Sequence, residues 1–157
     1  MRRKMWVAAI VSGLTAFGGS AAHATEPSGL QSEPVARGAA GQLAIEGGGG
    51  QFSINTKVPT DVAVVRVTLA PGGYTGWHGH PGPGAVVVKS GTVTLRGEHQ
   101  GQCHDVQYGP GKSFAHFQEP HNVVNPGPDP AELYVVYFVP EGTTAMVNDE
   151  PAPAACP

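Results

Sequence analysis

Positive charge is scarce in this sequence, and only one short stretch gathers it. The chain has nine Lys and Arg residues against twelve Asp and Glu, and three of the nine, Arg2, Arg3 and Lys4, stand together near the N-terminus. The other six are scattered singly along the chain. A nucleic-acid-binding surface needs clustered basic side chains to contact phosphates. The sequence therefore predicts no nucleic-acid partner, and the dispersed charges are interpreted as solvated surface.

Several familiar catalytic motifs are missing as well. The sequence has no Gly-x-Ser-x-Gly elbow, no phosphate-binding Gly-rich loop with a lysine, and no strand-to-helix dinucleotide fingerprint. Its 23 glycines indicate turns instead. The glycine run at 47–50 is interpreted as a flexible link, because no helical pattern follows it to bind a phosphate.

Hydrophobic runs long enough to span a membrane are also missing. The apolar run at 5–17 is interrupted by small and polar residues and is shorter than the about 20 residues that a spanning helix needs. It follows three basic residues and precedes Ala22-His23-Ala24, an order typical of a secretory signal peptide over residues 1–24. We predict cleavage after Ala24, no stable membrane anchor, and an exported chain that is periplasmic or secreted.

The expected mature chain, residues 25–157, is 133 residues long and fits one domain. Its six basic and twelve acidic residues give a net charge of −6. Residues 25–50 are rich in small residues and are predicted to be loosely ordered, whereas 51–147 carry strand patterns and form the predicted domain. Residues 148–157, rich in Pro and Ala, form a C-terminal tail.

Only two cysteines occur, Cys103 and Cys156, and both lie in the part expected to be exported. An oxidising compartment permits a disulfide between them, which would tether the tail and stabilise the fold by roughly 4 kcal/mol. Two independent free thiols are the alternative. We favour the disulfide, because an exposed free thiol outside the cell is prone to oxidation.

Short apolar runs separated by Gly and Pro predict an all-β core with eight or more strands, as in a sandwich or barrel. Residues 62–69 alternate most clearly, and 133–139 are apolar on both faces, which is typical of a central strand. Residues 85–88 and 92–96 are predicted to pair as a hairpin. The remaining predicted strands cover 52–58, 74–80, 102–108, 112–117 and 121–125.

Candidate chemistry concentrates in His78-Gly79-His80, because alternate residues of a strand project to the same face. Two neutral imidazoles on one face can bind one metal ion. The same pattern also fits two solvated histidines in a Gly- and Pro-rich loop. The pair alone leaves both interpretations open.

The surrounding residues resemble the two sequence motifs of the cupin family over about 62–140. Gly72, His78, His80 and Gly91 match the first motif, and His121-Asn122-Val123-Val124-Asn125 matches the end of the second. The chain is also similar to small exported cupins in four segments: residues 77–83, Cys103, residues 108–111 and Cys156-Pro157.

The resemblance implies a double-stranded β-helix, or jelly-roll, barrel with a divalent metal ion bound by His78, His80 and His121. The ion could be Fe, Zn, Ni, Mn or Cu. The resemblance and strand parity imply a pocket lined by Tyr74, Phe114 and Tyr137 or Phe138.

The sequence departs from the family pattern at one ligand. The usual acidic ligand falls at Gly84 or Ala85, neither of which has a coordinating side chain. Either three histidines suffice, or His116 or Glu119 substitutes. His116 has a further interpretation, as a histidine of the core or of a strand end.

Three functions remain open at this point. An incompletely coordinated metal suits catalysis, and the resemblance suggests a dioxygenase-like enzyme acting on a small organic molecule. The alternative is a noncatalytic module that binds a small ligand or metal. A weaker third option is a barrel without metal that acts through protein contacts. A small-molecule ligand or substrate is the expected partner, and a homodimer is allowed.

Overall fold

The computed structural model describes residues 25–116 and 119–156, so the predicted signal peptide lies outside the described residues. The described chain is almost entirely β, which confirms the predicted fold class. Within it, no helix is both long enough and apolar enough to cross a membrane. The strands are β1 (Ser28–Gly41), β2 (Ala44–Gly47), β3 (Phe52–Asn55), β4 (Thr60–Tyr74), β5 (His78–Gly79), β6 (Gly84–Ser90), β7 (Val93–His99), β8 (Gln102–Tyr108), β9 (Ser113–His116), β10 (His121–Val124), β11 (Ala131–Pro140) and β12 (Asn148–Asp149), with a short 3-10 turn, η1 (Gly48–Gly50).

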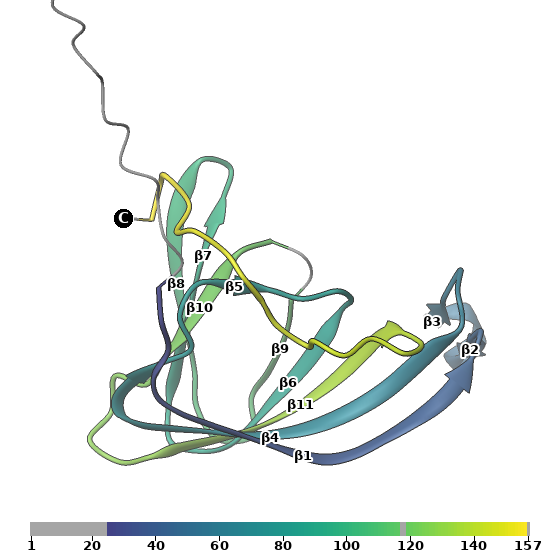
Figure 1. Ribbon diagram of the computed structural model, residues 1–157, viewed down its shortest axis with the longest axis horizontal. Coiled ribbons are helices and arrows are strands. Elements are labelled where there is room, and N and C mark those ends of the chain that lie inside the picture. The colour runs from purple at the N-terminus through teal and green to yellow at the C-terminus, as the bar shows by residue number, and fades with distance from the viewer. Residues whose placement is uncertain (1–24, 117–118, 157) are drawn as a thin grey trace, which may run out of the picture.

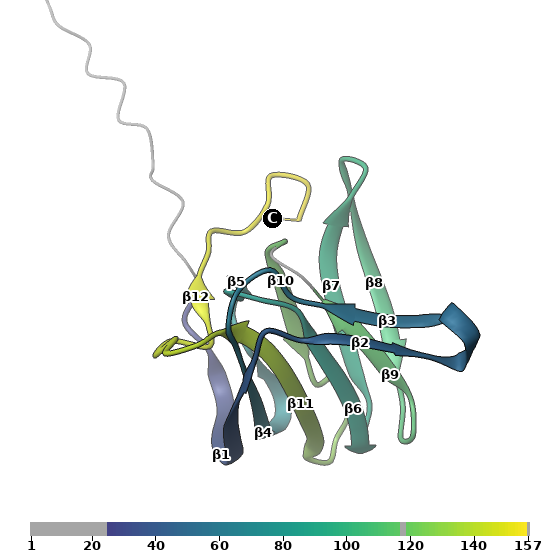
Figure 2. The same ribbon diagram turned by 90° about the vertical axis from the view of Figure 1, so that its right-hand side faces the viewer.

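Ten of these strands form one antiparallel sheet that folds over on itself into a nearly closed barrel. One side consists of β1, β4, β11, β6 and β9, and the other of β12, β5, β10, β7 and β8 (Figures 1 and 2). The two sides join where Val124 of β10 pairs with Tyr74 at the end of β4. This arrangement is a jelly roll.

Period-two burial shapes the barrel core. In β4, Ala63, Val65, Val67 and Leu69 are buried, as the alternation in the sequence predicts. In β11 the odd-numbered residues are buried, and the strand lies between β4 and β6 as a central strand. Valines from β6, β7 and β10 complete the apolar interior.

Residues 25–50, for which the sequence predicts loose order, contain a long strand. β1 runs antiparallel along β4, from Ser28 opposite Tyr74 to Gly41 opposite Thr60. Almost all of its side chains are exposed, and Leu30 is the residue that packs against the core. Backbone hydrogen bonds to β4, rather than buried side chains, hold this strand in place. Its sequence therefore needs no hydrophobic alternation, and without that pattern the strand was not predicted.

A two-stranded hairpin projects from the barrel beyond β1 and β4 (Figure 1). Its strands β2 and β3 pair only with each other in the described structure. They are joined through η1, where Gly48 and Gly49 have the positive φ angles that favour glycine. The run at 47–50 is therefore a turn within this hairpin.

The predicted hairpin between 85–88 and 92–96 is wrong. β6 pairs with β11 and β9, whereas β7 pairs with β10 and β8 on the other side of the barrel. The chain crosses between the two sides at Gly91, whose φ is +74°. A side chain there would collide with Ala131, so the corner requires glycine.

The C-terminal tail is held by two kinds of contact. We name residues 141–156 the C-terminal strap; within it, β12 pairs with β5, placing Asp149 opposite His78 (Figure 2). Cys156, buried at 1% exposure, forms the predicted disulfide with Cys103 of β8. The strap therefore links the residues around β5 to the β7–β8 hairpin.

Candidate metal centre

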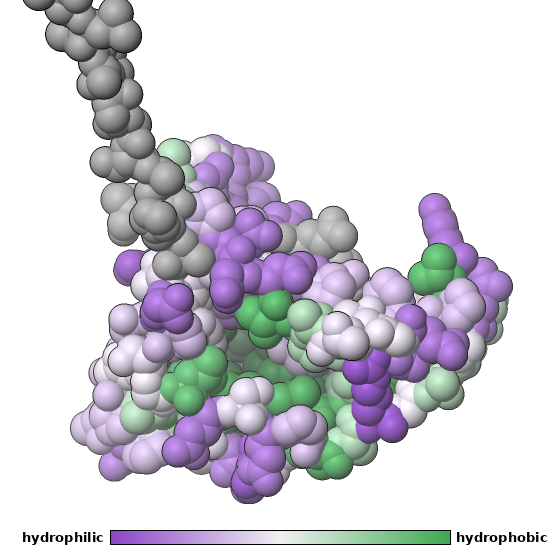
Figure 3. All heavy atoms as spheres, in the orientation of Figure 1, coloured by the Kyte–Doolittle hydropathy of each residue, from purple (hydrophilic) through white to green (hydrophobic). Residues whose placement is uncertain are grey.

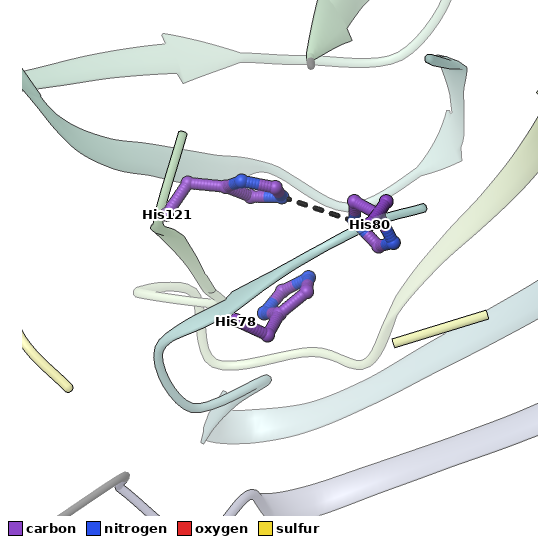
Figure 4. Close-up of side chains that lie close together, drawn as sticks. All are labelled: His78, His80 and His121. Atoms are coloured by element: carbon purple, nitrogen blue, oxygen red, sulfur yellow. Dashed lines mark hydrogen bonds between the residues drawn. The ribbon is translucent and has the colours of Figure 1, made fainter. Parts of the chain in front are cut away.

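Three buried histidines converge inside the barrel. His78 lies in β5, His80 follows that strand by one residue, and His121 begins β10, where it pairs with His78. Nitrogen atoms of all three rings lie within 4.8 Å of one another. Figure 4 shows the rings turned toward a common space. Residues separated by more than forty positions in the chain thus meet at one point.

Backbone carbonyls fix the orientation of each ring. The Nδ1–H groups donate to carbonyl oxygens: His78 to Gly76 (2.9 Å), His80 to Met146 (2.6 Å) and His121 to Glu119 (2.9 Å). A carbonyl oxygen can only accept, so the proton of each neutral imidazole is on Nδ1. Each Nε2 is left with a free lone pair. Backbone partners of this kind commonly orient metal-binding histidines.

The Nε2 atoms of His80 and His121 are 3.3 Å apart (Figure 4). With both protons on Nδ1, two lone pairs face each other and no hydrogen bond between them is satisfied. Two nitrogens bound to one tetrahedral ion, each about 2.0–2.1 Å from it, lie about 3.3 Å apart. The donor set therefore fits a divalent metal ion.

Burial keeps these histidines neutral. Removal from water lowers the pKa of His78, His80 and His121 below the usual value, in the case of His80 to about 4. The neighbouring imidazoles lower the pKa of His121 further, because they disfavour a second positive charge. Neutral imidazole is the form that binds a metal, so the rings are ready to coordinate at neutral pH.

A fourth histidine lies beside the three. His116 at the end of β9 is buried, and its ring centroid lies 4.3 Å from that of His80 and 4.6 Å from that of His121. Its Nδ1 is buried and has no hydrogen-bond partner within the described structure. Burial lowers the pKa of His116 to about 3, so this ring is also neutral.

The backbone of β6 leaves room for the ring of His116. Gly84 pairs with His116 across the β6–β9 ladder, and a Cβ atom at Gly84 would lie 2.3 Å from the Cε1 of that ring. Gly84 is one of the two positions where the family pattern has its acidic ligand. The imidazole of His116 on β9 thus fills the space that a side chain at position 84 of β6 would otherwise take.

A small cavity of about 40 Å³ adjoins the histidines. Its walls include the predicted pocket residues Phe114 and Tyr137, together with Thr75. Burial raises the pKa of Tyr137 to about 12, so its hydroxyl keeps its proton. Other walls are apolar and come from both sides of the barrel: Val67, Val86, Val123, Leu133 and Val135.

Two predicted pocket residues lie elsewhere. Tyr74 is half-buried at the end of β4 and does not line the cavity. The predicted strand over 74–80 is interrupted, since Gly76 has a φ of +73° and shifts the alternation, so Thr75 lines the cavity instead. Phe138 is half-buried on the opposite face of β11 from Tyr137.

Glu119 does not lie among the histidine nitrogens. It is exposed, and its carbonyl oxygen rather than its carboxylate contacts His121. It lines a separate outer groove of about 380 Å³ that reaches His116 and His121. His99 and His104 are exposed on the β7–β8 hairpin and line the same groove, consistent with the surface residues that the sequence predicts.

Sequence reasoning missed two features of the site. Thr75 was not identified; its Oγ1 accepts a hydrogen bond from the backbone N–H of Val123 (2.9 Å), which ties the first motif to β10. The carbonyl of Met146 was also missed, because no side-chain pattern signals a backbone acceptor. The absence of a side chain at Gly84 was the available sign that another residue fills that space.

Residues 65–137 match the model of the cupin domain. This stretch, 73 of the 157 residues of the chain, is similar to the cupin domain. The matched segment contains the four buried histidines and most of the barrel, so the match, the jelly-roll topology and the resemblance stated from the sequence agree. No curated protein matches the chain.

Several solved cupin-fold enzymes are similar in structure. Oxalate decarboxylase from Bacillus subtilis is 17% identical, with 56% of this chain and 23% of that chain covered and a TM-score of 0.50. An oxalate oxidase bound to glycolate is 20% identical, with coverage of 70% and 50% and a TM-score of 0.49. A DMSP lyase structure is 20% identical, with coverage of 60% and 45% and a TM-score of 0.47. The chain thus spans half or less of the length of these proteins, and at such identities the similarity shows the fold alone.

Proposed function

We propose that this protein is an exported cupin that binds one divalent metal ion through His78, His80 and His121 and oxidises a small organic molecule with O₂. The observation that carries the proposal is the convergence of three buried, neutral imidazoles whose Nδ1 protons are held by backbone carbonyls. Their lone pairs face one buried point, and a cation is the partner that satisfies all of them.

The residues of the chain have separate roles in this proposal. The histidines hold the ion, and when bound it supplies Lewis acidity and redox chemistry to ligands in its open positions. Tyr137 remains protonated and can donate a hydrogen bond to a ligand oxygen. The apolar walls of the cavity exclude water from the centre.

We also propose that His116 is a fourth ligand. Its ring lies beside those of His80 and His121, its Nδ1 is buried without a partner in the described structure, and Gly84 leaves the ring room. A buried polar atom without a partner is unfavourable, and coordination removes that cost. Four neutral ligands leave the full charge of the ion in place.

Metal content and oxygen uptake together test the proposed reaction. Protein purified from the compartment to which it is exported should contain one equivalent of a divalent metal by elemental analysis. Iron accompanied by O₂ uptake on a candidate substrate supports the oxygenase. Retention of a ligand without turnover would instead support the noncatalytic module.

The double variant His78→Ala, His121→Ala tests the ligands directly. It should lose metal retention while keeping the far-ultraviolet circular dichroism of the parent, because the surrounding apolar core is unchanged. The matched control is His99→Ala, His104→Ala, which also removes two histidines but on the exposed β7–β8 hairpin. Full metal retention in the first variant would refute the site.

Export is the third part of the proposal. The Cys103–Cys156 disulfide supports it, because disulfides persist in oxidising compartments. The order of basic residues, apolar run and Ala22-His23-Ala24 supplies the leader. N-terminal sequencing of the exported protein should begin at Thr25, and an intact Met1 in that fraction would contradict the proposed cleavage.

We further propose a homodimer formed through the β2–β3 hairpin. Ile45, Phe52 and Ile54 are 52%, 71% and 42% exposed, and strand register places them on one face. An isolated two-stranded hairpin is marginally stable in water, and burying this face against a second copy would stabilise it.

A further inference from the structure

A second cavity adjoins the metal centre on its apolar side. It has a volume of about 90 Å³ and lies among β1, β4 and the C-terminal strap, with Leu30 and Val147 at its outer walls. Figure 3 shows that this face of the molecule is hollowed and that apolar residues gather around the hollow. We name this cavity the apolar hollow.

The apolar hollow and the inner cavity share walls. Val67, Thr75, His78 and Tyr137 line both of them. Only the side chains that line both cavities therefore separate a molecule in the apolar hollow from the converging histidine nitrogens. A molecule that extends across both cavities would lie against Val67, Leu30 and Val147 at one end and near the three histidines and Tyr137 at the other.

The charge of the surroundings limits what can bind there. The lining of both cavities consists of apolar, hydroxyl and imidazole side chains. The guanidinium and ammonium groups of Arg37, Arg66, Lys89 and Arg96 line neither cavity, and each forms an ion pair with a carboxylate elsewhere. Among the described residues, no Lys or Arg lines either cavity, so positive charge at the centre would come from the proposed ion.

We propose that the substrate is a small molecule with one anionic oxygen group and an otherwise apolar body, and that it reaches the ion through the apolar hollow. This inference rests on the proposed metal site. A divalent ion held by neutral imidazoles keeps its full charge and favours an anionic oxygen ligand. A second charged group would lie against Leu30, Val67 or Val147, where its desolvation is not compensated.

The outer groove on the other side of the centre has a different character. Besides His116 and His121, its walls include Glu98, His99 and Glu119. Carboxylates there would repel an anionic molecule. No carboxylate of the described chain lines the apolar hollow, so the two cavities differ in charge, and the hollow suits an anionic organic substrate better.

Butyrate and succinate are matched probes for this inference, since they share a four-carbon chain and differ at the far end. Protein loaded with Zn²⁺, with metal content checked beforehand, is titrated with acetate, butyrate and succinate by calorimetry. Affinity should rise from acetate to butyrate by up to about fourfold for each buried methylene. Succinate should bind at least tenfold more weakly than butyrate.

Two valine variants distinguish the openings. Val147 at the apolar hollow and Val106 at the outer groove are 45% and 47% exposed, so either tolerates a polar side chain. Val147→Glu should weaken butyrate binding about tenfold, and Val106→Glu should leave it within twofold. The reverse result, or equal affinity for succinate and butyrate, would overturn the inference. Failure of the protein to hold Zn²⁺ would instead refute the proposed metal centre.

Discussion

At the scale of single residues, the pairing of Gly84 with His116 is the most informative departure from the family pattern. A side chain at position 84 and a ring at position 116 cannot share this space, because a Cβ at Gly84 would overlap the imidazole. A side chain at position 84 and the imidazole of His116 therefore exclude each other in this structure. The consequence is a site with neutral donors.

This mutual exclusion predicts the outcome of exchanging the two residues. His116→Gln should weaken metal binding about tenfold to a hundredfold, and Gly84→Glu alone should also weaken it, because the new side chain displaces the ring. The double variant Gly84→Glu, His116→Ala should recover much of the affinity, since it supplies a carboxylate in the space that the ring left. Equilibrium dialysis with Zn²⁺ measures all three, and additive losses in the double variant would contradict the mutual exclusion.

The buried histidines also predict acid sensitivity of the metal-free protein. Below about pH 6.5 the unfolded chain takes up protons on these rings, whereas the folded pKa values of His80 and His116 are about 4 and about 3. Because the unfolded state binds more protons, stability falls as pH decreases from about 6.5 to about 4. Each ring contributes up to about 1.4 kcal/mol for each pH unit.

Thermal unfolding between pH 7.5 and pH 4.5, followed in the presence of a chelator, measures this effect. The midpoint temperature should decrease steadily below pH 6.5, and the decrease should be shallower in His116→Gln, which has one fewer buried ring. A midpoint that does not change with pH would show that these rings are not buried in the metal-free protein.

How far the sequence predicted the site depended on whether the signal was local. His78 and His80 stand in a short His-x-His motif, and the resemblance to the two cupin motifs grouped them with His121. Thr75 was hidden because Gly76 breaks the strand parity on which Tyr74 was chosen. Gly84 and His116 lie on neighbouring strands that are far apart in the sequence. A local sequence pattern therefore could not predict their contact.

At the scale of elements, the C-terminal strap positions one of the proposed ligands. The carbonyl of Met146 accepts the Nδ1–H of His80, and β12 pairs beside His78. The amide of Glu150 donates to the carbonyl of Trp77 (3.0 Å). The strap is anchored at its far end by Cys156, so the disulfide acts on the site through the backbone.

Loss of this disulfide should therefore weaken metal binding at the proposed centre. Cys103→Ser, Cys156→Ser should lower stability by roughly 2–5 kcal/mol and weaken Zn²⁺ binding about tenfold. The measurements are denaturant unfolding and equilibrium dialysis. As a control, Thr143→Ala removes a hydrogen bond from the strap to the carbonyl of Pro140 at the end of β11, without releasing the far end of the strap. Unchanged metal affinity in the cysteine variant would mean that the strap does not position His80.

The sequence predicted strands well where one face of the strand packs in the core. It predicted them poorly where backbone hydrogen bonds alone hold the strand in place. β4 and β11 alternate clearly because one face of each enters the core. β1 escaped prediction because its exposed side chains carry no period. The pairing of β6 with β7 was predicted wrongly. A tight turn can connect two strands on opposite sides of a jelly roll as readily as it connects two paired strands of a hairpin.

At the scale of the whole molecule, the β2–β3 hairpin lies outside the barrel and leaves the metal centre independent of it. Variants of the hairpin can therefore change association without changing the site. Phe52 has the largest exposed fraction of the three apolar residues on its face.

Phe52→Ser should convert a dimer to a monomer, as measured by sedimentation equilibrium, while metal content stays at one equivalent for each chain. Val87→Ser is the matched control, because Val87 is 48% exposed on β6, a strand that does not pair with the hairpin. A parent protein that sediments as a monomer at all concentrations would contradict the proposed dimer.

The disulfide also sets an order of events during biogenesis. Met146 and Cys156 are synthesised after the histidines, so a partly made chain holds the rings without the acceptor and the covalent anchor that steady His80. At the metal site proposed here, selective metal uptake would then be expected to follow oxidation of the thiols. The composition of the compartment where that oxidation occurs, rather than that of the site of translation, would decide which ion the protein acquires.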